Sequence, residues 1–175
     1  MKKKTLFLAT AALSVSLMAI GTTQALAYNL TGAHWTSADR PVTISAVYSG
    51  TANGWLNGMG AWNATPTKAY FHQVAGNQTT ILYDANDSSV GWDGLSTWSP
   101  GTGIINNASG RLNYYYTKGY NANQIKGVAA HELGHILGLA HHSGCYLMVD
   151  NTPQRTSCGV YTPQSDDQAG INALY

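Results

Sequence analysis

The chain has 175 residues and a formal net charge of +1, and only a tenth of its residues are charged. The sequence contains no basic patch, which argues against a nucleic-acid-binding protein. Its length suits a single domain around one hydrophobic core of ordinary size.

The first 27 residues have the pattern of a secretory signal peptide. Lys2 to Lys4 are followed by an apolar run from Leu6 to Ile20 and then by Ala25-Leu-Ala27. A basic start, a short apolar run and an A-x-A end are typical of a cleaved signal. We therefore expect cleavage after Ala27, secretion to the extracellular space, and one domain over residues 28–175 with no membrane contact. An uncleaved membrane anchor is the alternative, although the apolar run is short for a bilayer span.

Between residues 28 and 83 the pattern predicts an extended arm, three strands and one helix. Residues 28–40 form the arm, and residues 42–48 alternate apolar and small polar side chains as a strand does. Residues 49–63 carry apolar side chains at helical spacing, which predicts a helix with one apolar face. Two further strands are expected at residues 69–74 and 79–83. The apolar residues of the expected helix are Trp55, Leu56, Met59 and Trp62.

Residues 84–100 read as a long loop that is rich in oxygen-bearing side chains. Such loops hold calcium in some proteins, so Ca²⁺ is a possible second cofactor. A solvated surface loop is the alternative reading. Short strands are expected next, at residues 103–107 and 111–117. The oxygen donors of the loop are Asp84, Asn86, Asp87 and Asp93.

The next element is predicted to be a helix that Asn121 caps and that runs to about Leu137. Within it, His131 and His135 lie one turn apart on the same face, so both imidazoles can reach one cation. Glu132 lies beside the same site, close enough to act on a water held by the metal. This His-Glu-x-x-His pattern predicts a metal centre on the helix.

Gly138 allows the chain to leave this helix with a positive φ, so that His141 can turn back as a third nitrogen ligand. Three histidines with an open fourth position are typical of a catalytic zinc site. The alternative is an apolar helix with buried core histidines. His142 is interpreted as a neighbour of the site, although an exchange of roles between His141 and His142 stays open.

The region after the histidines contains both cysteines of the chain, Cys145 and Cys158. In an exported protein a disulfide between them is the leading interpretation, and two free thiols are the alternative. The last expected element is a helix over residues 165–174. Ser165 is its predicted N-cap, and Asp166 and Asp167 suit its dipole.

With the histidines placed, the chain resembles the metzincin metalloproteases, whose signature is HExxHxxGxxH followed by a methionine turn. Met148 is the methionine available for that turn. Ala61-Trp62-Asn63, the stretch from Ile104 to Asn113 and the closing residues 166–175 resemble the matrixin branch in order and spacing. This resemblance implies an α+β fold: a twisted, mixed five-stranded sheet with three helices, the active-site helix being followed by the methionine turn.

The resemblance also implies a function, that of a secreted zinc-dependent endopeptidase related to the matrix metalloproteases. His131, His135 and His141 would hold the zinc, and Glu132 would serve as general base. Substrate would lie extended along an edge strand, expected near residues 103–107, and residues 148–164 would wall the specificity pocket. We expect a monomer that acts on proteins or peptides, those of the extracellular matrix among them.

Two features of vertebrate matrixins are missing from the sequence. Similarity to the catalytic domain begins almost at Tyr28, which leaves no room for a propeptide. No histidine lies between His72 and His131, so one zinc per chain is expected. The resemblance further implies that the ammonium of Tyr28, freed by signal cleavage, pairs with Asp166 or Asp167. A frayed N-terminus is the alternative.

Two other functions compete with the endopeptidase. One is a non-enzymatic, zinc-holding surface or adhesion protein on a protease scaffold, which would not need a carboxylate at Glu132. The other is a hydrolase of non-peptide amides, which would not need an edge strand for an extended substrate.

Overall fold

The structure is a computed structural model that describes residues 28–175. The expected signal peptide lies outside these described residues. In the described part of the chain, no helix is both long and apolar enough to cross a membrane.

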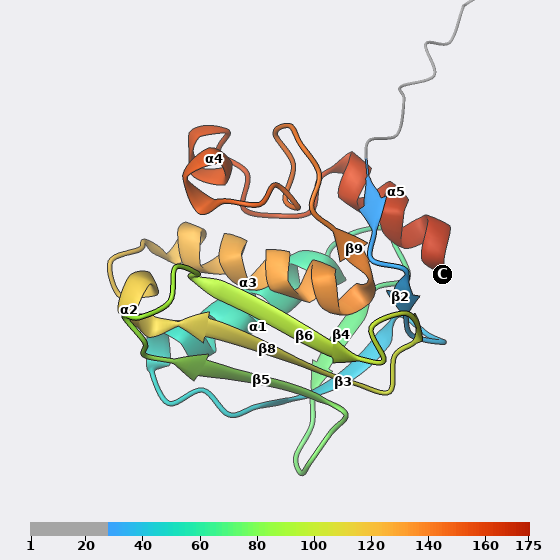
Figure 1. Cartoon of the computed structure of the whole chain (residues 1–175), viewed down its shortest axis with the longest axis horizontal. Helices are drawn as coiled ribbons and strands as arrows, with labels where there is room; N and C mark the ends of the chain where they lie inside the picture. The colour runs from blue at the N-terminus through green and yellow to red at the C-terminus, as the bar shows by residue number, and fades with distance from the viewer. Residues whose placement is uncertain (1–27) are drawn as a thin grey trace, which may run out of the picture.

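A twisted five-stranded sheet forms the body of the molecule (Figure 1). Three of its four strand pairings are parallel, and the fourth, between the edge strand β6 (Gly94–Ser99) and β8 (Asn107–Asn113), is antiparallel. The fold class expected from the resemblance, α+β with a mixed five-stranded sheet, is confirmed. The strands, in spatial order, are β4 (Tyr70–Gln73), β3 (Asp39–Ile44), β5 (Thr80–Ala85), β8 (Asn107–Asn113) and β6 (Gly94–Ser99).

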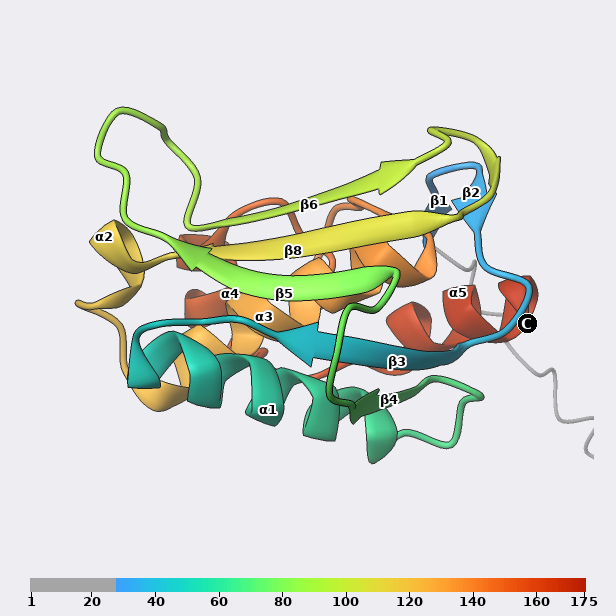
Figure 2. The same cartoon turned by 90° about the horizontal axis from the view of Figure 1, so that it is seen from below.

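Two helices, α1 (Ser49–Asn63) and α3 (Ala122–Leu137), cover one face of this sheet and pack against each other (Figure 2). Their approach is close because Gly58 has no side chain: a Cβ there would lie 2.9 Å from the Cβ of Ala129. The indole of the buried Trp62 donates to the carbonyl of Ala130 at 2.8 Å. Helix α1 therefore holds α3 in place through both packing and a buried hydrogen bond.

The three expected helices are present, the third being α5 (Ser165–Leu174), and two short helical segments are added to them. Segment α4 (Thr152–Ser157) lies in the stretch that follows the histidines. Segment α2 (Tyr114–Thr117) replaces the end of the strand expected at residues 111–117, and that expectation is wrong there. The side chain of Asn113 accepts a hydrogen bond from the backbone N–H of Tyr115, which starts a helical turn and overrides the strand preference of three tyrosines.

Three other expectations about strands also need correction. Residues 84–100 are not a continuous loop, because strand β6 lies within them. The expected strand at residues 103–107 is reduced to β7 (Gly103–Ile104), which pairs in parallel with β2 (Ala33–His34) in a separate two-stranded sheet. The extended arm contains β1 (Asn29–Leu30) besides β2, and the first strand of the main sheet begins earlier than expected.

Helix α3 begins and ends as the sequence predicts. Asn121 and Gln124 form a reciprocal capping box at its start, and Gly138 ends it with a φ of 108°. The chain then forms β9 (Leu139–Ala140), which pairs antiparallel with β1. This short pairing turns the chain back toward the helix and brings the residues after Ala140 beside it.

Candidate metal centre and active-site cleft

Three histidines from two parts of the chain converge on one point. His131 and His135 come from successive turns of α3, and His141 follows β9. Nε2 of His141 lies 3.1 Å from Nε2 of His131 and 2.9 Å from Nε2 of His135. In residues 28–175 these three form the one group of at least three His, Cys, Asp or Glu residues suited to hold a metal ion.

Hydrogen bonds fix which ring nitrogen of each helical histidine faces the centre. Nδ1 of His131 lies 2.8 Å from the carbonyl of Leu147, and Nδ1 of His135 lies 2.7 Å from the carbonyl of Leu139. A carbonyl only accepts, so each Nδ1 carries the proton and each Nε2 turns a lone pair inward. His141 can donate one hydrogen at most, so converging lone pairs are left that a cation would satisfy. The donor set fits zinc, which binds neutral imidazole nitrogens.

Burial keeps these imidazoles neutral. It lowers the pKa of His131 well below its usual value and that of His135 to about 4, and it also lowers the pKa of His141. The charge of Arg155 adds to this effect at all three histidines. Neutral imidazoles are the form that a metal ion requires, so the site is prepared for a metal at neutral pH.

Glu132 is buried beside the same centre, where it faces the first residue of the edge strand. A Cβ built on Gly94 would lie 2.5 Å from Oε1 of Glu132, so the carboxyl group packs directly against the strand backbone. Burial raises the pKa of Glu132 to about 8. A carboxyl group with a pKa near neutrality can both take up and release a proton under physiological conditions.

Met148 lies fully buried against the helix that carries His131 and His135. A Cβ on Gly134 would lie 2.4 Å from the sulfur of Met148, so the thioether rests against the backbone of α3. The carboxylate of Asp167 accepts hydrogen bonds from the backbone N–H groups of Leu147 at 3.0 Å and Met148 at 3.1 Å. Helix α5 therefore holds the methionine turn in position, a contact that the sequence reasoning did not anticipate.

His142 points away from the metal centre. Its Nε2 lies 3.4 Å from Oδ1 of Asp167 and 3.7 Å from Oδ2 of Asp166, in a buried cluster behind the methionine turn. The interpretation of His142 as a neighbour rather than a ligand fits this geometry, and His141 is the residue that faces the other two histidines.

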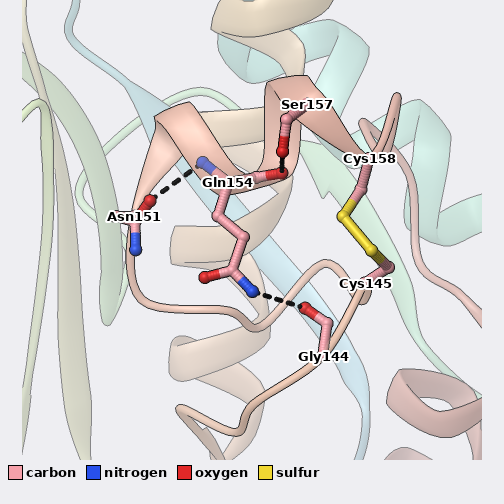
Figure 3. The surroundings of a disulfide bond; sticks show 6 residues. All are labelled: Gly144, Cys145, Asn151, Gln154, Ser157 and Cys158. Atoms are coloured by element: carbon pink, nitrogen blue, oxygen red, sulfur yellow. Dashed lines mark hydrogen bonds between the residues drawn. A yellow bond between two sulfur atoms is a disulfide. The ribbon is translucent and has the colours of Figure 1, made fainter.

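Cys145 and Cys158 form a disulfide, as the sequence predicted (Figure 3). The loop that it closes contains the whole of α4. The backbone N–H of Gln154 donates to the side chain of Asn151 at 2.9 Å, and the amide side chain of Gln154 reaches the carbonyl of Gly144 at 3.1 Å. The two ends of the loop are thus joined by a covalent bond and by a hydrogen bond across it.

A cavity of about 640 Å³ opens beside the histidines. Strand β6 forms one side of it, with Gly94 and Trp98, and residues 150–153 with Arg155 form another. Residues 148–164 were predicted to wall the pocket, and part of this stretch lies there. The prediction of the substrate edge at residues 103–107 is wrong, because the sheet edge that lines the cavity is β6.

Arg155 is a residue of this site that sequence reasoning missed. It is 3% exposed, and its Nη1 donates to the carbonyl of Val149 at 2.7 Å while its Nη2 donates to Oγ1 of Thr152 at 2.5 Å. Nη1 also lies 3.1 Å from Nδ1 of His131. Because that Nδ1 donates its proton to Leu147, the guanidinium acts on His131 through its charge. Arginine is seldom buried, and nothing in the local sequence marks this one.

The N-terminal segment also reaches the metal centre. Nδ2 of Asn29 donates to the backbone carbonyl of His141 at 2.9 Å, and the backbone N–H of Thr31 donates to the carbonyl of Gly138 at 2.9 Å. Tyr28 lies against α5, since a Cβ on Gly170 would lie 3.2 Å from the Cβ of Tyr28. The start of the described chain is therefore packed between the third histidine and the last helix.

The oxygen-rich residues expected as possible calcium ligands do not form a metal-binding group in the described part of the chain. Oδ2 of Asp84 accepts hydrogen bonds from Val47, Tyr48 and Thr51. Oδ1 of Asp87 accepts from Ser89. These carboxylates are used to hold loops, and calcium binding stays a prediction.

A mixed five-stranded sheet, a helix with the HExxHxxGxxH pattern and a methionine beneath its histidines together define a metzincin. The model of the matrixin family matches residues 33–175, so the chain belongs to the matrixin family.

Similarity to individual proteins agrees with this family. Interstitial collagenase from Bos taurus is 32% identical over 123 residues, which are 65% of this chain and 25% of the collagenase. The extracellular small neutral protease of Streptomyces lividans is 28% identical over 116 residues, which are 65% of this chain and 47% of that protease. The chain thus spans a quarter and about half of the length of these two relatives.

Solved structures of two other proteins also match. The hatching enzyme zinc-protease HCE-1 of the medaka fish Oryzias latipes aligns with a TM-score of 0.42 at 21% identity, over 62% of this chain and 50% of that one. Myroilysin aligns with a TM-score of 0.43 at 13% identity, over 62% of this chain and 52% of that one.

Proposed function

We propose that this protein is a secreted zinc-dependent endopeptidase. The observation that carries the proposal is the convergence of the Nε2 atoms of three histidines beside a buried carboxyl group, at the wall of a cavity that a sheet edge borders. His131, His135 and His141 would hold one zinc ion. When bound there, the ion supplies Lewis-acid chemistry, because it polarises the scissile carbonyl and makes water acidic enough to ionise near neutral pH.

The chain's own residues would carry the other steps. An extended substrate would add a strand to the exposed edge of β6, so main-chain hydrogen bonds would orient it whatever its side chains. Glu132 would accept the proton of the attacking water and pass it to the leaving amine. The carbonyls of Leu147 and Leu139 would keep the two helical imidazoles in the orientation that binds the metal.

Replacement of Glu132 by alanine tests this mechanism. General-base assistance contributes about 10²–10⁴-fold to a rate, so Glu132→Ala should lose at least about 100-fold in kcat while its zinc content stays unchanged. Asp87→Asn is a matched control, because it removes an exposed carboxylate that holds only a surface loop. A Glu132→Ala protein with full peptidase activity would refute the assigned role.

We also propose that signal cleavage after Ala27 completes the fold of a monomeric, single-domain enzyme. The ammonium of Tyr28 would pair with Asp166, since Tyr28 packs against Gly170, one helical turn further along α5. Asp167 is the less suitable of the two carboxylates, because it already holds the methionine turn. A protein that carries one extra residue before Tyr28 should be less active than one that begins at Tyr28. Equal activity of the two would contradict the pairing.

A further inference from the structure

Two opposite charges line the cavity beside the metal centre without touching each other. Arg155 comes from α4, and Asp93 immediately precedes β6. Asp93 is the strongest favourable charge acting on Arg155, yet within residues 28–175 no nitrogen of Arg155 lies within 4 Å of a carboxylate oxygen. Both groups line the cavity, so a substrate atom in the cavity could contact either of them.

Each of these two side chains is held by hydrogen bonds to the protein, and each has donor hydrogens or an acceptor oxygen that these bonds do not use. Arg155 is anchored by Val149 and Thr152, but its Nε–H and the second hydrogen of its Nη2 have no acceptor among the described residues. Oδ2 of Asp93 accepts the hydroxyl of Tyr120 at 2.9 Å, and its Oδ1 accepts no hydrogen bond from the described chain. The cavity therefore offers donors on one side and an acceptor on the other.

We propose that Arg155 and Asp93 select a side chain with a carboxamide tip, that of glutamine, on the residue after the scissile bond. This inference rests on the proposed function. A carboxamide presents a carbonyl oxygen for Arg155 and an N–H for Asp93, so it satisfies both groups at once. Of the two side chains that carry this tip, glutamine is the longer, and the proposal commits to it.

Other side chains leave part of this arrangement unsatisfied. A glutamate offers only acceptors when ionised, so one of its carboxylate oxygens would face the carboxylate of Asp93. A leucine would remove water from both charges and replace none of the lost hydrogen bonds. A lysine could pair with Asp93 but would leave the donors of Arg155 without an acceptor. Specificity of this kind comes as much from the penalties on the wrong residue as from contacts with the right one.

A series of quenched fluorescent peptides that differ only at the residue after the scissile bond tests the inference. For the zinc-loaded protein, kcat/KM for the glutamine peptide should exceed that for the leucine and glutamate peptides at least tenfold. That factor corresponds to the loss of one hydrogen bond to a charged group. A glutamine peptide cut within threefold of the leucine peptide would overturn the proposal.

Two variants separate the contributions of the charges. Asp93→Asn keeps the shape of the side chain and can still accept the hydroxyl of Tyr120, and it should raise the glutamate-to-glutamine ratio at least tenfold. Arg155→Met should lower the glutamine-to-leucine ratio of kcat/KM at least tenfold, both peptides being measured on the same protein. If Arg155→Met does not fold, Asp93→Asn decides alone, and an unchanged ratio in that variant overturns the proposal.

A binding measurement separates this inference from the proposed activity. Calorimetry with zinc-loaded Glu132→Ala should show at least tenfold tighter binding of the glutamine peptide than of the leucine peptide, whether or not the native protein cleaves either. Selective binding of the glutamine peptide without any cleavage by the native protein would contradict the proposed endopeptidase function. It would still support the proposed selection of glutamine. Cleavage together with equal binding of the two peptides would contradict only the selection.

Discussion

Oε1 of Glu132 packs against the backbone of Gly94, where a Cβ would lie only 2.5 Å away from it. The same Cβ would lie 2.7 Å from a methyl group of Val128, one turn earlier on α3. Gly94 is the first residue of β6, so the edge strand reaches the helix only because this position has no side chain. The place of the proposed general base thus depends on the absence of a methyl group on the neighbouring strand.

Gly94→Ala should therefore displace the carboxyl group of Glu132. We expect kcat to fall at least tenfold, because a general base must lie within hydrogen-bonding reach of the proton that it takes. Zinc content should not change, since no metal-facing histidine contacts Gly94 in this way. Gly101→Ala is the control, because its added methyl group would meet open space. Wild-type kinetics in Gly94→Ala would show that the position of Glu132 is not limiting.

Asn29 supports the third histidine through the hydrogen bond from its Nδ2 to the carbonyl of His141. Asn29→Ala should weaken zinc binding, because His141 is exposed and this hydrogen bond holds its backbone carbonyl. Hydrogen bonds that orient the metal-binding residues typically contribute about 10–100-fold to metal affinity. Competition with a chromogenic chelator measures the effect, and Asn77→Ala, an exposed position, is the control. The idea fails if both variants hold zinc equally well.

The disulfide should stabilise the protein through the loop that contains α4. Cys145 and Cys158 are separated by 13 positions, and closing a loop of this size typically contributes about 3 kcal/mol to the free energy of unfolding. The double variant Cys145→Ser, Cys158→Ser should lose stability of that order in urea. Because α4 carries Arg155, the preference of the double variant for the glutamine peptide should also weaken. Unchanged stability together with an unchanged preference would show that the hydrogen bonds of the loop suffice.

The metal-free protein should lose stability as the pH falls from about 6.5 to about 4. Burial lowers the pKa of His135 to about 4 and also lowers that of His131, so each of these two histidines binds more protons in the unfolded chain than in the folded one in this range. Stability then rises with pH, and a single histidine contributes about 2 kcal/mol between pH 5 and neutrality. Urea titrations in the presence of a chelator measure this slope. A His135→Gln variant with the same slope as the native chain would contradict this explanation.

Helices and metal ligands were predictable because their signals are local. The bounds of α1, the cap at Asn121 and the end of α3 at Gly138 all follow from residues within a few positions of one another. The His-Glu-x-x-His spacing places two histidines on one helical face without any knowledge of the rest of the fold. The third histidine needed only a turn that glycine permits.

Strand β6 was not predictable in the same way, because its pairing is not local. Gly94–Ser99 mixes glycine, serine and threonine with two apolar residues, which is typical of a loop, and it becomes a strand by pairing with β8 on one side. The methionine-turn contact of Asp167 and the burial of Arg155 likewise join elements that are distant in the chain. Such contacts follow from packing, which a single sequence does not display.

The most direct test of the central claim is the hydrolysis of a mixed peptide library by the purified, zinc-loaded protein. We predict cuts at internal peptide bonds that a chelator abolishes, that added zinc restores, and that Glu132→Ala does not make. A folded, zinc-loaded protein that cuts no peptide in the library would contradict the assignment of an endopeptidase.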